Sequence, residues 1–101
     1  MADLMRTLTE QIIGKGYQSD IWVNMDYYPQ EYTELKPYTV SYIDYESMDA
    51  DNYGSYDTRQ EARQAYTELV KIATDYSKSL LRHTYTLSDY IGFRMQEGAI
   101  L

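Results

Sequence analysis

Residues 58–80, TRQEARQAYTELVKIATDYSKSL, decide the fold because they carry the clearest periodicity in the chain. Thr58 and Glu61 are spaced as in a capping box, where a hydroxyl and a carboxylate satisfy the first free amides of a helix. At about 100° per residue, the apolar side chains that follow share one arc of about 120°, with charged side chains opposite. The pattern predicts a long amphipathic helix whose buried arc holds Ala62, Ala65, Tyr66, Leu69, Ile72, Ala73, Tyr76 and Leu80.

A second, shorter helix is expected towards the end of the chain, ending near Gly98. Thr86 and Ser88 are candidate caps at its start. Its apolar residues recur at a spacing of four, at Leu87, Ile91 and Met95.

Alternating residues before the long helix predict strands. The first strand runs through Ile21, Val23 and Met25, which alternate with Trp22, Asn24 and Asp26. The second covers residues 38–46. Its inward face carries either Val40 and Tyr42 or Ile43 and Tyr45, and the sequence does not decide between them. A third, short strand is expected at residues 53–56, after a turn at residues 48–52.

The first sixteen residues are expected to form a helix. Leu4, Leu8 and Ile12 recur at a spacing of four, and Gly14 and Gly16 would stop the helix. The predicted fold is therefore a small α+β two-layer domain. It has an N-terminal helix, a two- or three-stranded antiparallel sheet, a long helix and a short C-terminal helix.

The chain has 101 residues, 44% of them hydrophobic, and a formal net charge of -7. This length is enough for one compact core, so we expect a single domain over residues 1–101. The absence of cysteine excludes a disulfide framework and a thiolate zinc site, and it fits a cytoplasmic location. The negative charge argues against nucleic acid or an anionic membrane as a direct partner, because both are polyanions.

The sequence holds no recognisable catalytic or metal-binding motif. His83 is the only histidine, which excludes a histidine-rich metal site and identifies no catalytic triad. Residues 49–60 resemble a twelve-residue calcium loop, but Tyr53 takes its fifth place, and Gln60 stands where a bidentate glutamate would close the coordination sphere. We therefore interpret this segment as a turn between strands, and we expect no enzyme activity, no metal and no cofactor.

Negative charge and tyrosine both concentrate in the middle of the chain. Residues 17–57 carry nine acidic side chains against Lys36 alone, and nine of the thirteen tyrosines lie there. Tyrosine suits an interface because it brings a large area and a hydroxyl while immobilising only two torsions. Carboxylates around it steer a basic partner inward. The sheet face that no helix covers, with its rim, is therefore expected to bind a partner through Trp22, Asp26, Tyr28, Glu31, Glu34, Tyr42, Asp44, Glu46, Asp49 and Asp51.

These observations predict a non-enzymatic acidic module that occupies a basic surface of another protein, including a surface that normally holds nucleic acid phosphates. Small acidic inhibitors encoded by phages and mobile elements, such as anti-CRISPR and antirestriction proteins, are similar in size and charge. That similarity is one of composition and not of motif. Two alternatives stay open: a homodimeric structural or accessory protein that uses the free sheet face, and a small-ligand binder.

Overall fold

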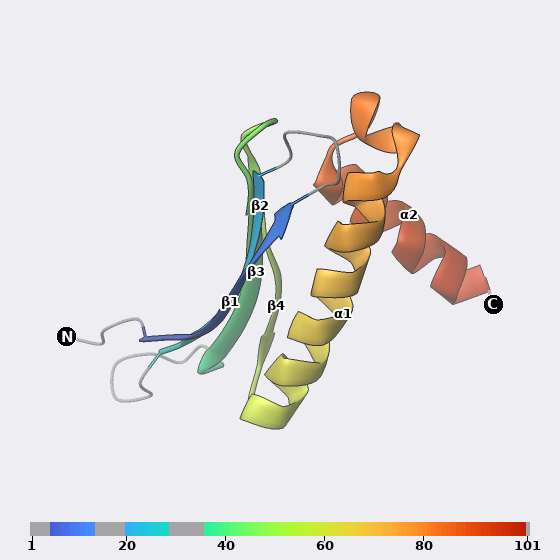
Figure 1. Cartoon of the computed structure of the whole chain (residues 1–101). Helices are drawn as coiled ribbons and strands as arrows, with labels where there is room; N and C mark the ends of the chain where they lie inside the picture. The colour runs from blue at the N-terminus through green and yellow to red at the C-terminus, as the bar shows by residue number, and fades with distance from the viewer. Residues whose placement is uncertain (1–4, 14–19, 29–35, 101) are drawn as a thin grey trace.

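The computed structural model describes residues 5–13, 20–28 and 36–100, and in these ranges it shows an antiparallel sheet with helices on one face (Figure 1). The sheet has four strands in chain order, so the two-layer α+β architecture is confirmed, with four strands instead of two or three. The elements are β1 (Met5–Ile13), β2 (Asp20–Tyr27), β3 (Tyr38–Asp44), β4 (Asp49–Tyr56), α1 (Arg59–Lys78), the 3-10 helix η2 (Leu80–His83) and α2 (Leu87–Ile100).

The expected N-terminal helix is wrong, because Met5–Ile13 form strand β1, paired with β2. The spacing of four between Leu8 and Ile12 is also a multiple of two, so it fits one face of a strand as well as one stripe of a helix. Both side chains pack on the core. A bulge at Thr7, whose Oγ1 donates to the Met25 carbonyl oxygen at 3.2 Å, places Leu8 opposite Met25 and sets this alternation.

Helix α1 is confirmed, with Thr58 as its N-cap, while the Glu61 carboxylate bonds the Thr58 hydroxyl. The Thr58 Oγ1 accepts from the Glu61 backbone N–H at 3.2 Å and donates to the Glu61 carboxylate at 2.9 Å. The predicted arc is buried from Ala62 to Tyr76. Leu80 is the exception and is 77% exposed, because the extended backbone at Ser79 ends α1 and turns the chain into η2.

The core lies between α1 and the two central strands. Ile21, Val23 and Met25 of β2 are fully buried, and so is Val40 of β3. The even-numbered residues of β3 therefore face α1, which decides between the two faces that the sequence left open. Helix α2 packs against α1 and β4 through two of its expected positions, Leu87 and Ile91, whereas the third, Met95, is 52% exposed.

The connection between β3 and β4 differs from the prediction. The turn covers residues 45–48, and β4 begins at Asp49, so the expected turn at residues 48–52 and strand at 53–56 have the wrong bounds. Asp49 and Asn52 favour turns by themselves. Pairing of Asp49 with Asp44 places them in the ladder instead. Met48 closes the turn with a φ of 57°, in the left-handed region.

Candidate functional site

The ten predicted binding residues do not form one surface on the free face of the sheet. Glu31 and Glu34 lie outside the described residues. The others divide between the free face, the helix-covered face and the end of the sheet at the β3–β4 turn.

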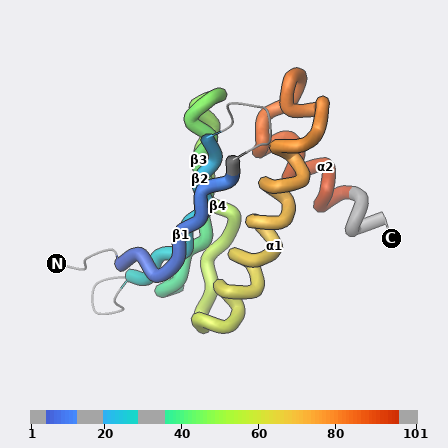
Figure 2. Tube along the Cα trace, in the orientation of Figure 1, coloured from blue at the N-terminus to red at the C-terminus, as the bar shows by residue number. Residues whose placement is uncertain are grey.

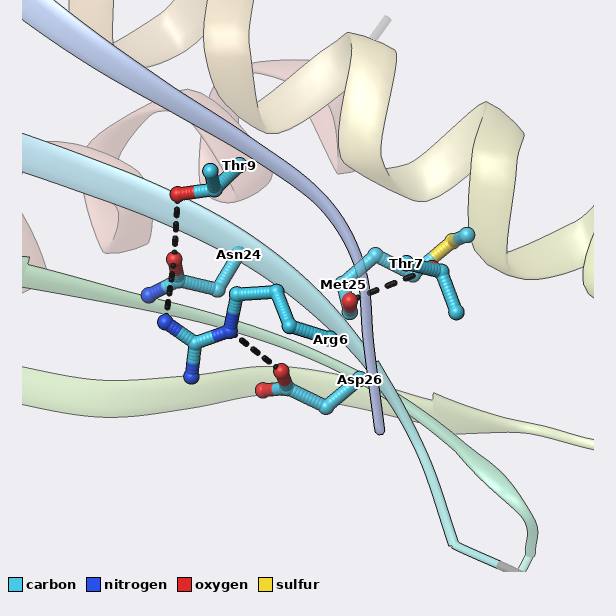
Figure 3. Close-up of polar contacts among 6 residues, drawn as sticks. All are labelled: Arg6, Thr7, Thr9, Asn24, Met25 and Asp26. Atoms are coloured by element: carbon cyan, nitrogen blue, oxygen red, sulfur yellow. Dashed lines mark hydrogen bonds and ion pairs between the residues drawn. The ribbon is translucent and has the colours of Figure 1, made fainter. Parts of the chain in front are cut away.

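Asp26 lies on the free face but is only 5% exposed, because Arg6 of β1 covers it (Figure 3). The Arg6 Nε donates to the Asp26 Oδ1 at 2.7 Å, and its Nη1 donates to the Asn24 Oδ1 at 3.0 Å. Thr9 donates to the same Asn24 oxygen at 2.7 Å. The carboxylate of Asp26 is thus neutralised within the sheet, and it is unavailable to steer a basic partner.

Trp22 and Tyr28 are the two predicted aromatic residues that reach the surface. Trp22 lies half-buried on the free face, where its indole Nε1 donates to the Asp20 Oδ1 at 2.9 Å. Gln11 of β1 donates to the same oxygen at 2.8 Å, so β1 helps to fix the carboxylate that accepts from the indole. Tyr28 follows β2 and is 38% exposed, at the opposite end of the strand from Asp20.

Tyr42 and Asp44 belong to the helix-covered face, so their predicted place on the free face is wrong. Tyr42 is buried, and its hydroxyl shares a hydrogen bond with Ser88 at the start of α2. Burial raises the pKa of the Tyr42 hydroxyl. Asp44 is 3% exposed and accepts from the Glu46 backbone N–H at 3.0 Å, a contact that shapes the β3–β4 turn.

Asp49 fastens the C-terminal helix to the sheet. Its two carboxylate oxygens accept from the Ser88 backbone N–H at 2.9 Å and from the Ser88 hydroxyl at 3.0 Å. A carboxylate is favourable here because the free amides at a helix start carry partial positive charge. Thr86 and Asp89 add a reciprocal cap, at 3.1 and 3.2 Å. Asp49 is thus part of the fold as well as of the local charge.

Carboxylates nevertheless gather at one end of the molecule, around the β3–β4 turn. Asp44 and Asp49 are paired across the two strands, Glu46 lies in the turn between them, and the Asp20 carbonyl oxygen accepts from the Tyr45 backbone N–H at 3.0 Å. Asp51 follows two residues after Asp49 on β4, and Asp89 is next to Ser88, which Asp49 binds. We call this set the acidic end; it comprises Asp20, Asp44, Glu46, Asp49, Asp51 and Asp89.

Helix η2 lies at the same end of the molecule as the turn (Figure 2). A hollow of about 210 Å³ separates them, lined by Asp44, Glu46, Ser47, Tyr76 and Arg82. The pKa of the Tyr76 hydroxyl is raised to about 12, mainly by burial and then by the negative charges of Asp44, Glu46 and Asp49, with Arg82 opposing the rise. At the Tyr76 hydroxyl, three carboxylates of the acidic end therefore act against one arginine.

Large apolar side chains stand exposed on the same turn and on η2. Met48 is 73% exposed at its left-handed backbone position, and Leu80 is 77% exposed. Tyr45 and Leu81 are exposed as well, at 50% and 42%. The sequence reasoning missed these four residues. Only the backbone shows that residues 45–48 form the turn and that α1 stops before Leu80.

The described residues form a further hollow and no cluster of metal ligands. Within them, no three histidine, aspartate or glutamate side chains gather in a geometry that could hold a metal ion. The calcium-loop resemblance ends at β4, since Asp49–Tyr56 is extended and does not coil round a central point. A hollow of about 330 Å³ between β4, α1 and α2 places Glu68 beside Lys71 and Arg94, charges of opposite sign.

Comparison with known proteins gives no relative. No family model, no curated protein and no solved structure matches the chain. Neither α1 nor α2, over the part of the chain that is described, has the length and apolar run needed to cross a bilayer. A functional proposal therefore rests on the charge, exposure and geometry of this chain alone.

Proposed function

We propose that the protein is a non-enzymatic binding module whose acidic end occupies a basic surface of a partner protein in the cytoplasm. The observation that carries the proposal is the gathering of six carboxylates around the β3–β4 turn, next to four exposed apolar side chains. This site replaces the free sheet face that the sequence indicated, where Arg6 neutralises Asp26.

The six carboxylates act in two ways: some contact the partner directly, and others contribute only negative charge. Asp44 and Asp49 are held by backbone and hydroxyl groups, so they fix the turn and α2 while contributing charge. Glu46 and Asp51 are exposed, which leaves their carboxylates to meet arginine or lysine of a partner. A rigid array of one sign raises association rates with a surface of the other sign, and it does so less in high salt.

The exposed apolar residues supply surface that can be buried against the partner, which charge alone does not provide. A methionine at a φ of 57° is strained by roughly 1 kcal/mol, since only glycine and, to a lesser extent, asparagine adopt that region readily. Strain of this kind often accompanies function. Met48 is presented to solvent, with Tyr45 three residues before it, so an apolar centre lies among the charges, as in protein interfaces with a dry core and a polar rim.

Surfaces that hold nucleic acid are the basic surfaces that an acidic end of this kind fits best. They are built to accept dense negative charge, and rigid carboxylates present the same sign to them. The phage and mobile-element inhibitors that resemble this chain in size and charge act as protein ligands of such a kind. Competition between the acidic end and duplex DNA for one partner is the corresponding expectation.

A capture experiment with matched variants tests this function. Immobilised wild type is exposed to nuclease-treated lysate from the source cells, and bound proteins are eluted with a salt gradient and identified by mass spectrometry. The variant Glu46→Lys with Asp51→Lys removes the two exposed carboxylates of the acidic end. Its control, Glu10→Lys with Asp57→Lys, changes the net charge equally but lies on β1 and beyond the other end of β4.

Wild type and the control are expected to capture the same basic protein, the acidic-end variant is expected to lose it, and duplex DNA is expected to release it. The function is refuted if both variants capture the same proteins as wild type, or if both lose them. Circular dichroism spectra and melting curves of the two variants establish that they are folded.

A further inference from the structure

The free face of the sheet carries three rows of side chains that cross all four strands. Residues directly opposite in antiparallel strands share a face, so the register defines the rows. The first row, at the end nearest the β3–β4 turn, is Gln11, Trp22, Ile43 and Ala50; the second is Thr9, Asn24, Ser41 and Asn52; the third is Arg6, Asp26, Thr39 and Ser55.

The two halves of this face differ in size. The β1 and β2 half carries the large side chains, including Arg6, Gln11 and Trp22. The β3 and β4 half carries mostly small ones, such as Ser41, Ala50 and Ser55. From side-chain size, the β1 and β2 half is expected to stand higher than the β3 and β4 half, with the step between them running along the strand direction.

We propose that a second copy of this chain covers the free face, packed sheet against sheet about a two-fold axis parallel to the strands. Such an axis, lying between β2 and β3, preserves the strand direction and exchanges the two halves. The high half of one copy then meets the low half of the other. Trp22 faces Ile43 of the other copy, Asn24 faces Ser41, and Arg6 faces Ser55. An axis across the strands would place β1 against β1 and large side chains against large ones.

The polar groups of the face are suited to being covered. Arg6 and Asp26 cancel each other's charge, so the three rows are neutral although the chain carries -7. Asn24 and Asp26 are already more than nine-tenths buried, and the Oδ1 of each is hydrogen-bonded within the sheet. Covering the face leaves these hydrogen bonds intact. Arg6, whose side chain is 49% exposed, loses water but keeps its ion pair with Asp26, which lowers the penalty for burying its charge.

The area of the face is close to what a specific dimer needs. Four strands at about 4.8 Å and about eight residues at 3.3 Å give about 500 Å² in projection. Protruding side chains raise the accessible area above its projection, and the smaller specific interfaces bury about 600 Å² per partner. The sheets would lie about 10 Å apart, as in aligned β-sandwiches.

Sedimentation equilibrium and the fluorescence of Trp22 test this dimer together. Trp22 is the only tryptophan, so its emission reports the interface directly. The mass is expected to rise from 11.9 kDa towards twice that value with increasing protein concentration, while the emission shifts to the blue and iodide quenching falls. Added salt is expected to tighten the dimer by screening two like-charged copies, whereas it would weaken a basic partner's hold on the acidic end.

Ser41→Arg and Ala50→Arg place a guanidinium between the sheets, and each is expected to weaken self-association by at least about a hundredfold, the effect of an unpaired buried charge. Gln64→Arg on the exposed side of α1 is the control and leaves the dimer intact. A chain that stays monomeric up to about 0.5 mM, or a dimer that persists in both sheet variants, overturns the proposal. Neither result bears on partner capture by Glu46 and Asp51, which lie off the three rows.

Discussion

Replacing Asp26 with alanine is expected to destabilise the fold, because this carboxylate is a structural partner of Arg6 and not a free surface charge. The charged hydrogen bond between them is 2.7 Å long, and the Asp26 side chain is 7% exposed. Hydrogen bonds to charged groups contribute about 1.5–3 kcal/mol. The larger loss of about 3–5 kcal/mol that follows breaking a fully buried pair does not apply, since the Arg6 side chain is 49% exposed and water can hydrate it.

We therefore expect the free energy of unfolding to fall by about 2 kcal/mol. With an unfolding entropy of about 2.1 cal/mol/K per residue, a chain of 101 residues loses about 9 °C in Tm. Thermal melts followed by circular dichroism, with urea titration at 25 °C, measure both quantities. Asp51→Ala is the matched control, because it removes one exposed carboxylate and relieves the same general repulsion. Its Tm is expected to stay within about 2 °C of wild type.

A double-mutant cycle completes the test. Arg6→Ala combined with Asp26→Ala is expected to lose little more stability than either single variant, which gives a coupling free energy of about 1–2 kcal/mol. If Asp26→Ala and Asp51→Ala melt at the same temperature, or if the two losses simply add, the ion pair does not stabilise the sheet and Asp26 returns to the set of residues free to bind a partner.

Three further outcomes are expected. The free energy of unfolding falls as the pH rises from about 10 to 12, because Tyr53 and Tyr76 have pKa values raised to about 12 in the fold, mainly by burial, while the unfolded chain loses those protons near 10. Urea titrations across this range measure the fall in wild type and a smaller fall in Tyr53→Phe. An equal dependence of the unfolding free energy on pH in both proteins would contradict this expectation. Met48→Gly leaves the free energy of unfolding unchanged or raises it by up to about 1 kcal/mol, because the strained φ is relieved, and it weakens partner capture. Thermal melts measure the first effect, and a lower Tm would show that Met48 packs within the fold. Thr58→Ala removes the cap of α1 and lowers the free energy of unfolding, measured by urea titration, by about 1 kcal/mol. Thr67→Ala on the same helix is the control and loses less than half as much. Equal losses would mean that the Thr58 cap contributes nothing.

The sequence predicted those elements whose periodicity has only one interpretation. The period of residues 59–78 fits a helix alone, and Ile21, Val23 and Met25 fit a strand alone, so both were confirmed. The spacing of four between Leu8 and Ile12 fits both, and tertiary pairing with β2 decides the outcome. In β3 the apolar residues fall at odd and even positions alike, and only the packing of Val40 and Tyr42 against α1 reveals the inward face.

Binding residues were harder to predict than secondary structure, because charge in a sequence does not show what neutralises it. In the sequence, Asp26 and Asp49 look like Glu46, an acidic residue in an acidic segment. Asp26 is bound by Arg6, 20 positions away, and Asp49 is bound by Ser88, 39 positions away. These partners meet only through strand register and the docking of α2. The exposed Met48 carried no sequence signal at all, since methionine is not a turn former.

The chain order of the elements has a consequence for synthesis on the ribosome. The sheet is a meander, β1 to β4, and every strand pairs with the one made just before it, so its hairpins need only short loop closures. Its apolar face, however, packs on α1, which is made only after all four strands. At about 5–20 residues per second, the twenty residues of α1 take about 1–4 s to appear, and during that time the nascent sheet has one apolar face uncovered. Chaperone binding to the nascent chain is therefore expected to begin with β2 and β3 and to end as soon as α1 has emerged.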